Sequence, residues 1–433
     1  MAVRKSTTGP SSRAGIIGLG YVGLPLAMEF ASVGVTVVGV DIDKRRVASL
    51  KAGRSYIEDV PSAVLKKHVD SGRFIPTTDY TELSSVGAVS ICVPTPLGKS
   101  KDPDMTPVAG AAESLVPVLR KGQTIVLEST VYPGATEEFV KPILERSGLK
   151  AGKDFNLAFS PERIDPGNKK FTVPEIAKVV GGVNAQSTKA AADHYARVFK
   201  KVMAVGSTRE AEMAKLLENT FRAVNIGLVN ELAVVSHSMG IDIWKVIEAA
   251  SSKPFGFMPF YPGPGWGGHC IPVDPFYLTW RARVDGNEVG FIDHAGRVNN
   301  KMPHYTVERI ADLLNDRGKA LKGARVMVLG AAYKRDVADV RESPALEVIK
   351  LLEQRGSAVT YHDQHVPSLV VEDKTHRSVP MTAASLKKQD CVVIITDHRS
   401  VDYSFVARNS PLVFDTRNAT ASIRPKFNNI TVL

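Results

Sequence analysis

One stretch near the N-terminus, residues 14–41, constrains the fold more than any other part of the chain. It reads AGIIGLGYVGLPLAMEFASVGVTVVGVD, in which an apolar strand turns through Gly18-x-Gly20-x-x-Gly23 into a helix and then a second strand. Such glycines let a diphosphate approach the backbone at a helix N-terminus. Asp41 ends the second strand, where an acid accepts hydrogen bonds from a ribose. The stretch predicts a doubly wound α/β domain that binds a dinucleotide.

The same acid bears on the choice of cofactor. A carboxylate at Asp41 repels a 2′-phosphate, which favours NAD over NADP. Arg45 and Arg46 follow closely and keep NADP open as the alternative.

The strand-and-helix alternation continues as far as residue 162. SVGAVSICVPTP, QTIVLEST and FNLAFSPER read as further strands of an open parallel sheet, and residues 109–119 read as a helix. Ser129, Thr130 and Glu162 stand at strand ends, where such a sheet presents its ligand site. The alternatives are a turn or cap role for Ser129 and Thr130, and a solvated loop acid for Glu162.

A long helix is predicted over residues 211–240, which contain no proline and one interior glycine before residue 240. At 1.5 Å per residue it spans about 45 Å, a length that suits a connector between two domains and a dimer surface. Lys215, Asn219, Arg222 and Asn230 drift along one face of this helix. That face is either solvated or lines a site.

Residues 257–280, FMPFYPGPGWGGHCIPVDPFYLTW, gather five prolines and four glycines around Cys270. This composition excludes a regular helix or central strand and predicts a rigid loop that holds a thiol, with Asp274 four residues on. A thiol attacks as the thiolate, so such a loop suits a nucleophile. The alternative is a structural loop whose cysteine packs as a small hydrophobe.

The other cysteines, Cys92 and Cys391, lie in apolar runs and are predicted to be core strand residues. Three cysteines without a CxxC pair argue against a zinc site or a disulfide framework, and we expect no metal. Free cysteines fit a reducing cytoplasm.

Residues 323–363 repeat the order of elements predicted for residues 14–41. They read as strand ARVMVLG, a turn, helix ESPALEVIKLLEQRG and strand AVTYHD. The turn lacks GxGxxG and carries Lys334, Arg335, Asp336 and Arg341. We therefore expect a second doubly wound domain that binds a phosphorylated ligand through side-chain charge. LKKQDCVVIITDH and PLVFDTRN complete its strands.

Charge and hydropathy limit the partners. The net charge of +10 is scattered, which suits either an anionic small substrate or a solvated surface. No basic stripe interleaved with aromatics points to nucleic acid. No apolar run approaches the roughly 20 residues of a membrane span. Residues 1–13 are polar and basic and read as a flexible tail rather than a signal peptide.

Several motifs stand together in an order typical of one family: GLGYVGLPLA, VPTP, EST, FSPER, KLLENTFRAVNIGLVNE, GPGWGGHCIPVD and GAAYKRDVADVRESP. Over residues 14–418 the chain resembles the UDP-glucose/GDP-mannose dehydrogenase superfamily. FSPERIDPGN and the sequence around Cys270 are similar to its UDP-N-acetylglucosamine 6-dehydrogenase branch. The resemblance implies NAD-dependent, four-electron oxidation of the sugar C6 hydroxyl to a carboxylate, for surface polysaccharide synthesis.

The resemblance also implies roles for individual residues. Cys270 would hold the C6 aldehyde as a thiohemiacetal and then as a thioester. Lys215 would stabilise oxyanion charge, and Asn219, Asp274 and Thr130 would orient or activate water. Glu162 would act as the base in thioester hydrolysis or assist proton transfer.

Two sets of binding residues follow in the same way. Implied contacts with NAD are Gly18, Gly20, Tyr21, Val22, Gly23, Asp41, Arg46, Pro94, Thr95, Ser129, Thr130 and Arg341. Implied contacts with the UDP-sugar are Glu162, Arg163, Lys215, Asn219, Arg222, Tyr261, Gly263, Gly267, Arg297, Tyr333 and Lys334. Among these, Arg297 is expected to reach the substrate of a partner subunit.

Three departures from the family pattern are visible. His269 stands where UDP-glucose enzymes carry a small residue, and we interpret it as a packing or loop residue rather than a proton shuttle. Trp266 replaces a leucine that is frequent in the nearest branch. Lys334-Arg335-Asp336 stands where UDP-glucose enzymes show Lys-Pro-Asp, which argues against UDP-glucose.

The expected architecture is an NAD-binding Rossmann domain at 14–210, a central helical and dimerisation domain with the cysteine loop at 211–315, and a UDP-sugar-binding Rossmann-like domain at 316–433. We expect a cytoplasmic homodimer or higher homo-oligomer. The alternative substrates are UDP-N-acetylmannosamine and then UDP-glucose. Outside this reaction, the alternatives are a silent nucleotide-sugar binder and an alcohol dehydrogenase that stops at the aldehyde.

Overall fold

The structure is a computed structural model that describes residues 12–98, 102–163, 171–268 and 270–433. Most of the expected N-terminal tail, and His269, lie outside these residues. The chain divides into two compact units. The first unit comprises Met1–Glu218 and Phe276–Gly286, and the second comprises Asn219–Pro275 and Asn287–Leu433.

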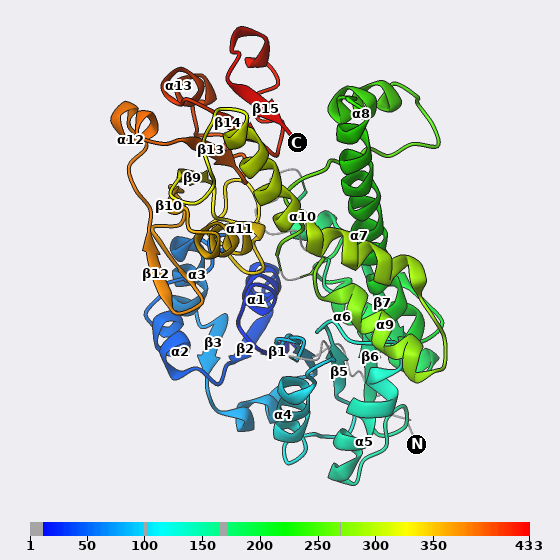
Figure 1. The fold of residues 1–433 in the computed structure, drawn as a ribbon. Helices are drawn as coiled ribbons and strands as arrows, with labels where there is room; N and C mark the ends of the chain where they lie inside the picture. The colour runs from blue at the N-terminus through cyan, green and yellow to red at the C-terminus, as the bar shows by residue number, and fades with distance from the viewer. Residues whose placement is uncertain (1–11, 99–101, 164–170, 269) are drawn as a thin grey trace, which may run out of the picture. The chain divides into compact units, whose positions relative to one another are not determined.

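The first unit is built on an eight-stranded sheet with the order β3-β2-β1-β4-β5-β6-β7-β8 (Figure 1). Its elements are β1 (Arg13–Ile17), α1 (Gly23–Ser32), β2 (Thr36–Val40), α2 (Lys44–Lys51), α3 (Ser62–Asp70), β3 (Phe74–Thr77), β4 (Ala88–Ile91), α4 (Thr106–Leu115), β5 (Thr124–Leu127), α5 (Lys141–Leu144), β6 (Asn156–Phe159), β7 (Lys178–Gly182), α6 (Ala185–Tyr195) and β8 (Val202–Ala204).

The predicted open sheet is confirmed, and its strands pair in parallel from β3 to β6. β7 then pairs antiparallel to β6, a reversal that the sequence analysis did not predict. The helix expected at 109–119 is present but lies earlier, at Thr106–Leu115, because Pro107 fits its first turn. Helices α1, α3 and α6 contribute to one core, in which the rings of Phe30 and His194 stack 4.5 Å apart.

The second unit contains a five-stranded parallel sheet with the order β10-β9-β13-β14-β15 and a two-stranded hairpin, β11-β12. Its elements are α8 (Ile243–Ser251), α10 (Gly290–Asn315), β9 (Arg325–Leu329), α11 (Pro344–Gln354), β10 (Ala358–His362), β11 (Ser368–Val371), β12 (Lys374–Arg377), α12 (Ala383–Lys387), β13 (Cys391–Ile394), α13 (Tyr403–Asn409), β14 (Val413–Asp415) and β15 (Ile430–Val432). The predicted repeat of strand, helix and strand is confirmed as β9, α11 and β10.

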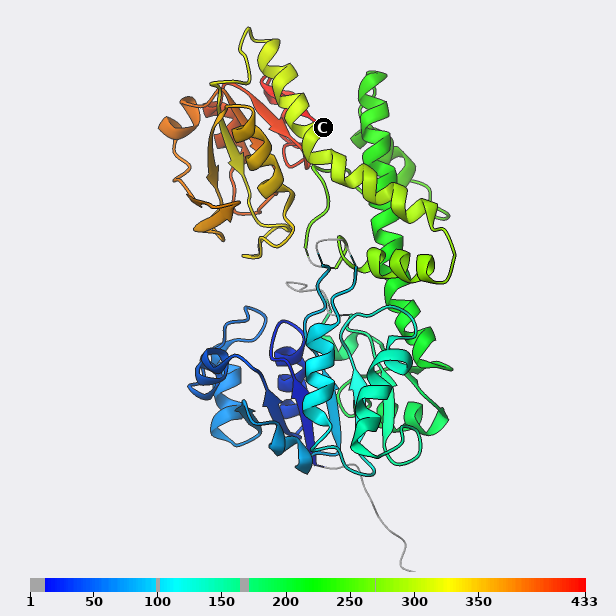
Figure 2. The same cartoon turned by 60° about the horizontal axis from the view of Figure 1, so that its bottom comes forward.

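Two helices belong partly to each unit: α7 (Thr208–Ser238) and α9 (Asp274–Val284). The long predicted helix is confirmed as α7, whose 31 residues form one helix, drawn in green in Figure 2. The expectation that all of residues 257–280 form a loop is wrong from Asp274 onward, where α9 begins. A helix is possible there because Pro275 falls in the first turn, where a missing N–H costs nothing.

In the first unit, α7 and α9 share one anchor. Glu138 lies in a short π-helical turn, η2 (Thr136–Val140), and its carboxylate accepts from Arg209 of α7 at 2.8 Å. The same carboxylate lies 2.5 Å from Nη1 of Arg281 in α9. Nearby, the rings of Tyr132 and Trp280 pack with centroids 4.8 Å apart, so α9 is also held by apolar contact.

The remaining short turns are 3₁₀ helices, namely η1 (Tyr80–Ser85), η3 (Glu145–Ser147), η4 (Val173–Glu175) and η5 (Arg424–Lys426). None of the helices in the described part of the chain has the length and apolar character that crossing a membrane requires.

Candidate active site

The turn between β1 and α1 is shaped by its glycines. Gly18 has φ +88°, and a Cβ placed on it would lie 2.6 Å from the carbonyl oxygen of Cys92. A Cβ on Gly23 would lie 1.9 Å from the carbonyl oxygen of Gly18. At Gly20 a Cβ would meet no described heavy atom within 4 Å, so this face of the turn is open. Because the N-cap Val22 has no polar side chain, the first amides of α1 suit an anionic diphosphate.

Asp41 is fixed at the end of β2. Its Oδ2 accepts from the Leu19 amide and its Oδ1 from the Asp43 amide, both at 2.9 Å. Arg46 lies with Nη1 3.8 Å from Asp41 Oδ2 and its guanidinium over the ring of Tyr56. The acid therefore stands beside the glycine turn, as a ribose contact requires. The residues of this unit fit a dinucleotide.

The ends of β4 and β5 lie together. The Ser129 hydroxyl donates to the carbonyl oxygen of Val93 at 2.7 Å, which ties the two strand ends to one another. Its hydrogen is thus used within the protein, in agreement with a structural role, and its contact with the cofactor stays a prediction. Thr130 is partly exposed beside it, as is Thr95, whereas Pro94 is exposed.

Lys215 and the end of β6 form a second group in the first unit. The Lys215 side chain is buried, and its Nζ donates to the carbonyl oxygen of Glu162 at 2.6 Å. Arg163 pairs with Glu218 at 2.8 Å and donates to the carbonyl oxygen of Ala177 at 2.6 Å. The structure therefore brings Glu162, Arg163 and Lys215 together, as predicted.

A buried charged network behind Glu162 was not predicted. Lys178 Nζ lies 2.5 Å from Glu128 Oε2 and 3.9 Å from Glu162 Oε2. The other Glu128 oxygen accepts from the Tyr195 hydroxyl at 2.5 Å. Burial lowers the pKa of Lys178, but Glu128 and Glu162 outweigh it and raise that pKa above its ordinary value. The sequence feature that could have indicated this network is the position of Glu128 and Lys178, two charged residues at the ends of apolar strands.

In the second unit, Asn219 and Asp274 form a buried pair. Asn219 Nδ2 donates to Asp274 Oδ2 at 2.5 Å, and both side chains are almost fully buried. The Asp274 amide in turn donates to the carbonyl oxygen of Cys270 at 2.8 Å. Cys270 thus stands on the turn that begins α9, and it is partly exposed. The predicted association of Asn219, Asp274 and Cys270 is present.

The other two cysteines are buried strand residues, as predicted. Burial raises the pKa of the Cys92 thiol well above its usual range and that of Cys391 to about 12. Neither thiol therefore forms a thiolate readily, which leaves Cys270 as the candidate nucleophile.

The glycine-rich loop before Cys270 packs its backbone against neighbours. A Cβ on Gly267 would lie 2.8 Å from the Cβ of Tyr333, and the Gly268 amide donates to the carbonyl oxygen of Arg341 at 3.1 Å. The Gly263 amide donates to Asn230, which itself donates to Asn299 at 2.7 Å. The predicted rigid loop is explained by these contacts, and Asn230 of the polar α7 face holds the loop.

The remaining predicted substrate residues differ in exposure. Tyr261 is exposed and stacks on Trp244, with ring centroids 6.2 Å apart. Arg222 and Arg297 are exposed on α7 and α10. Lys334 is partly exposed in the turn after β9, whereas the exposed Arg341 binds Asp339 through two nitrogens. Their contacts with ligands stay predictions.

Family models cover nearly the whole chain. The NAD binding domain of the UDP-glucose/GDP-mannose dehydrogenase family matches residues 12–202, its central domain matches 209–301, and its UDP binding domain matches 327–422.

Individual proteins show the same similarity. UDP-N-acetyl-D-glucosamine 6-dehydrogenase of Pseudomonas aeruginosa is 38% identical over 394 residues, which cover 89% of this chain and 90% of that protein. UDP-N-acetyl-D-mannosamine dehydrogenase of Pyrococcus horikoshii is 33% identical over 412 residues, 94% of this chain and 95% of that protein. A solved structure of the UDP-D-ManNAc dehydrogenase of Pyrococcus horikoshii matches with TM-score 0.88 and 31% identity over 97% of this chain and 98% of that one. The chain therefore belongs to the UDP-glucose/GDP-mannose dehydrogenase family and is an NAD-dependent nucleotide-sugar dehydrogenase.

Proposed function

We propose that the protein oxidises the C6 hydroxyl of UDP-N-acetylglucosamine to the carboxylate in two steps that each reduce one NAD. The observation that carries the reaction is Cys270, a partly exposed thiol on a turn whose carbonyl oxygen holds the Asp274 amide. The choice of sugar is supported by relatives named UDP-N-acetyl-D-glucosamine 6-dehydrogenase, at 38% and 37% identity.

The thiol of Cys270 forms the covalent intermediates of the reaction. After the first hydride leaves C6, the Cys270 sulfur adds to the aldehyde and forms a thiohemiacetal. Loss of a second hydride from that carbon gives a thioester, which water cleaves to the carboxylate and the free thiol. The Gly18–Gly23 turn would hold NAD, which would supply the hydride acceptor for each step. The balance is two NAD reduced and one water consumed per sugar.

Side chains of the protein assist these reaction steps by stabilising charge and by orienting water. Lys215 stabilises negative charge on the C6 oxygen, a task that suits a buried ammonium. The Asn219–Asp274 pair orients or activates the hydrolytic water, and Thr130 helps to position it. Glu162 acts as the base in thioester hydrolysis or assists proton transfer.

Counting NADH tests this proposal. With excess NAD and limiting UDP-N-acetylglucosamine, we expect two NADH per sugar. The Cys270→Ala variant should keep UDP-sugar binding and lose turnover, whereas Cys391→Ala, a control for loss of a buried thiol, should keep the two-to-one ratio. One NADH per sugar in the wild type would show that the reaction stops at the aldehyde. Full turnover by Cys270→Ala would rule out the thioester route.

UDP-N-acetylmannosamine is the second candidate substrate. It is favoured by relatives named UDP-N-acetyl-D-mannosamine dehydrogenase, at 32–33% identity, and by the solved structure with TM-score 0.88. Parallel assays with UDP-N-acetylmannosamine and UDP-glucose decide between them. A kcat/KM for either sugar above that for UDP-N-acetylglucosamine would move the assignment to that sugar.

We also propose that the protein is a homodimer assembled through α7. Exposed apolar side chains recur on this helix at spacings of three, four and seven, with exposed fractions of 41% to 61%. They are Met213, Leu217, Phe221, Leu228, Leu232 and Val235. Such a stripe is typical of a helix that packs against another helix, and a second copy supplies an identical one.

Light scattering after gel filtration tests the assembly. Leu228→Glu combined with Leu232→Glu should shift a dimer to monomer, whereas Lys245→Glu on α8 should leave it unchanged. An unaltered mass for the double variant would place the interface elsewhere. Synthesis of a surface polysaccharide precursor in the cytoplasm remains a prediction from the sequence.

A further inference from the structure

The second unit repeats the nucleotide-binding layout of the first. Gly330 follows β9 with φ +83°, and a Cβ on it would lie 2.4 Å from the carbonyl oxygen of Thr396, much as Gly18 approaches Cys92 after β1. The Ala331 amide donates to Asp363 Oδ2 at 2.7 Å, as the Leu19 amide donates to Asp41 Oδ2. Asp363 therefore occupies the position in this unit that Asp41 occupies in the first.

The two acids differ in what else they bind. The Asp363 carboxylate also accepts from the amides of Ala332 and His365, at 3.0 and 2.8 Å. His398, which is buried, places Nε2 2.9 Å from Asp363 Oδ2. Three of these four bonds fall on Oδ2 and one on Oδ1, and the Asp363 side chain is almost fully buried. Asp363 therefore accepts four hydrogen bonds within its own unit, whereas Asp41 accepts two from backbone amides.

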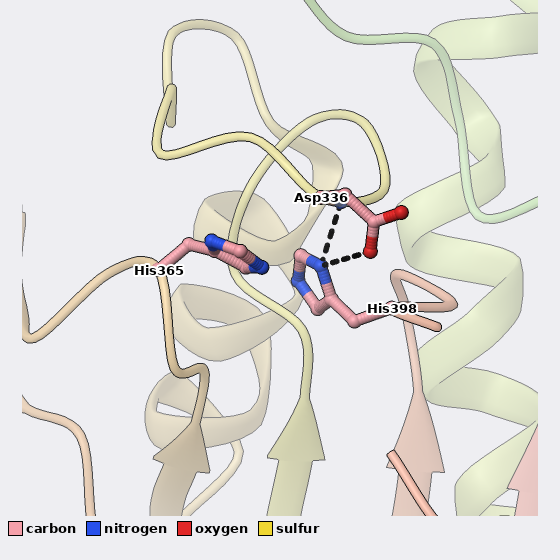
Figure 3. A group of neighbouring side chains, drawn as sticks. All are labelled: Asp336, His365 and His398. Atoms are coloured by element: carbon pink, nitrogen blue, oxygen red, sulfur yellow. Dashed lines mark hydrogen bonds and ion pairs between the residues drawn. The ribbon is translucent and has the colours of Figure 1, made fainter. Parts of the chain in front are cut away.

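The other side of the His398 ring faces the turn after β9. Its Nδ1 accepts the backbone N–H of Asp336 at 2.9 Å, as Figure 3 shows. Because Nδ1 receives a hydrogen, the ring hydrogen lies on Nε2 and is donated to Asp363. His398 therefore joins the end of β10 to the turn that carries Lys334 and Arg335.

Asp336 needs this support. It has φ +60°, which is unfavourable for a residue other than glycine. Its carboxylate accepts from the Arg399 amide at 3.0 Å and from Arg399 Nε at 2.9 Å. Arg335, the preceding residue, forms an ion pair with Asp397. The segment Asp397–Arg399 thus holds the turn through three consecutive residues, with His398 at its buried centre.

We propose that His398 is a positioning residue that, through Nδ1, holds the Lys334–Asp336 turn in the conformation that binds the diphosphate of the UDP-sugar. The proposal rests on the assignment of UDP-sugar binding to the second unit. Lys334 supplies the positive charge, and the bond between His398 and the Asp336 amide keeps the backbone of the turn in place when no ligand is bound.

A metal site is the competing interpretation of the same cluster. Asp336, His365 and His398 each offer a ligand atom, and these atoms lie within 4.8 Å of one another (Figure 3). However, the Nδ1 lone pair is already used by the Asp336 amide, and the Asp336 carboxylate is bound by Arg399. A metal ion would have to break these bonds, so the contacts favour a hydrogen-bonded latch.

Two variants separate the two sides of the imidazole. In His398→Asn the side-chain oxygen reaches the Nδ1 position and can still accept from Asp336. In His398→Gln the amide nitrogen reaches the Nε2 position and can still donate to Asp363. Both variants lose one bond, but only His398→Gln releases the turn.

Calorimetric titration with UDP and with NAD measures the affinity of each variant for the two ligands. We expect His398→Gln to bind UDP about tenfold more weakly, the size of one hydrogen bond, and His398→Asn to stay within about threefold. NAD affinity should be unchanged in both variants, which shows that the first unit is folded. In steady-state assays, KM for the sugar should rise more than kcat falls.

Four results would overturn the proposal. Wild-type UDP affinity in His398→Gln, or equal weakening in the two variants, would show that His398 does not hold the turn for ligand binding. Stoichiometric Zn²⁺ binding by the wild type, lost in both variants, would replace the latch with a metal site. Absence of UDP binding by the wild type would overturn the proposed function, and the latch with it.

Discussion

The ammonium of Lys178 is buried between two carboxylates, 2.5 Å from Glu128 and 3.9 Å from Glu162. Removing one member of a buried ion pair leaves an uncompensated charge. Lys178→Met should therefore lower the free energy of unfolding by about 3–5 kcal/mol, measured by urea denaturation.

Two comparison variants isolate the cause. Adding Glu128→Gln to Lys178→Met should restore part of the loss, because the more deeply buried of the two carboxylates is then uncharged. Lys189→Met removes an exposed ion pair with Asp193 and should change stability by less than about 1 kcal/mol. An equal loss of unfolding free energy in Lys178→Met and Lys189→Met would contradict the importance of burial.

The glycine turn offers a matched pair of substitutions. Gly23→Ala brings a Cβ to 1.9 Å from the Gly18 oxygen, so the backbone must move, and we expect a stability loss of about 1–3 kcal/mol together with weaker NAD binding. Gly20→Ala meets no described atom within 4 Å and should leave the unfolding curve unchanged. Its NAD affinity should still fall, because the Cβ meets the diphosphate. Unchanged affinity in Gly20→Ala would place the diphosphate elsewhere.

The Asn219–Asp274 pair predicts a pH-dependent defect. Asn219→Asp puts a second buried carboxylate beside Asp274, and two such groups do not ionise together readily. We expect NADH formation at pH 8 to fall roughly 100-fold, with partial recovery at lower pH as the pair retains a proton. Asn225→Asp, a partly exposed change on the same helix, is the control. An equal effect of the two substitutions would argue against a specific role for the pair.

Glu212 predicts a stability change between pH 4.5 and 7. Burial raises the pKa of this carboxyl from 4.5 to about 7, although hydrogen bonds from Thr136 and Gly134 oppose the shift. The folded state then binds a proton more tightly than the unfolded state. The stabilisation is present below pH 4.5 and is lost as the pH rises through 7, by at most about 3 kcal/mol.

The Glu212→Gln variant does not titrate and serves as the reference. Urea denaturation at pH 4.5 and pH 8 should show the wild type losing more stability than this variant as the pH rises. A constant difference between the two proteins would show that Glu212 has an ordinary pKa in the folded state.

The sequence was sufficient for features that depend on local pattern. The glycine turn with Asp41, the 31-residue α7 and the repeat over β9, α11 and β10 all follow from spacing and hydrophobic periodicity. The association of Asn219 with Asp274 could be proposed only from the family resemblance, because 55 positions separate them along the chain.

The features that were missed depend on tertiary contact. Lys178 begins an apolar strand, and only the fold shows that Glu128 lies beside it. The strands β11, β12 and β15 are only three or four residues long, which is too short for a clear alternation of apolar and polar residues. The start of α9 was hidden by Pro275, since a proline in the first turn reads in sequence as a helix breaker.

The shared anchor at Glu138 has a mechanical consequence. The chain passes between the two units through α7, through α9 and through the segment after Gly286, and both helices end their first-unit portions near one carboxylate. One carboxylate therefore links a residue of α7, Arg209, to a residue of α9, Arg281. Without the Glu138 side chain, α9 would still be held by the packing of Trp280 on Tyr132, and α7 by the amides of Gly134 and Thr136, which donate to Glu212.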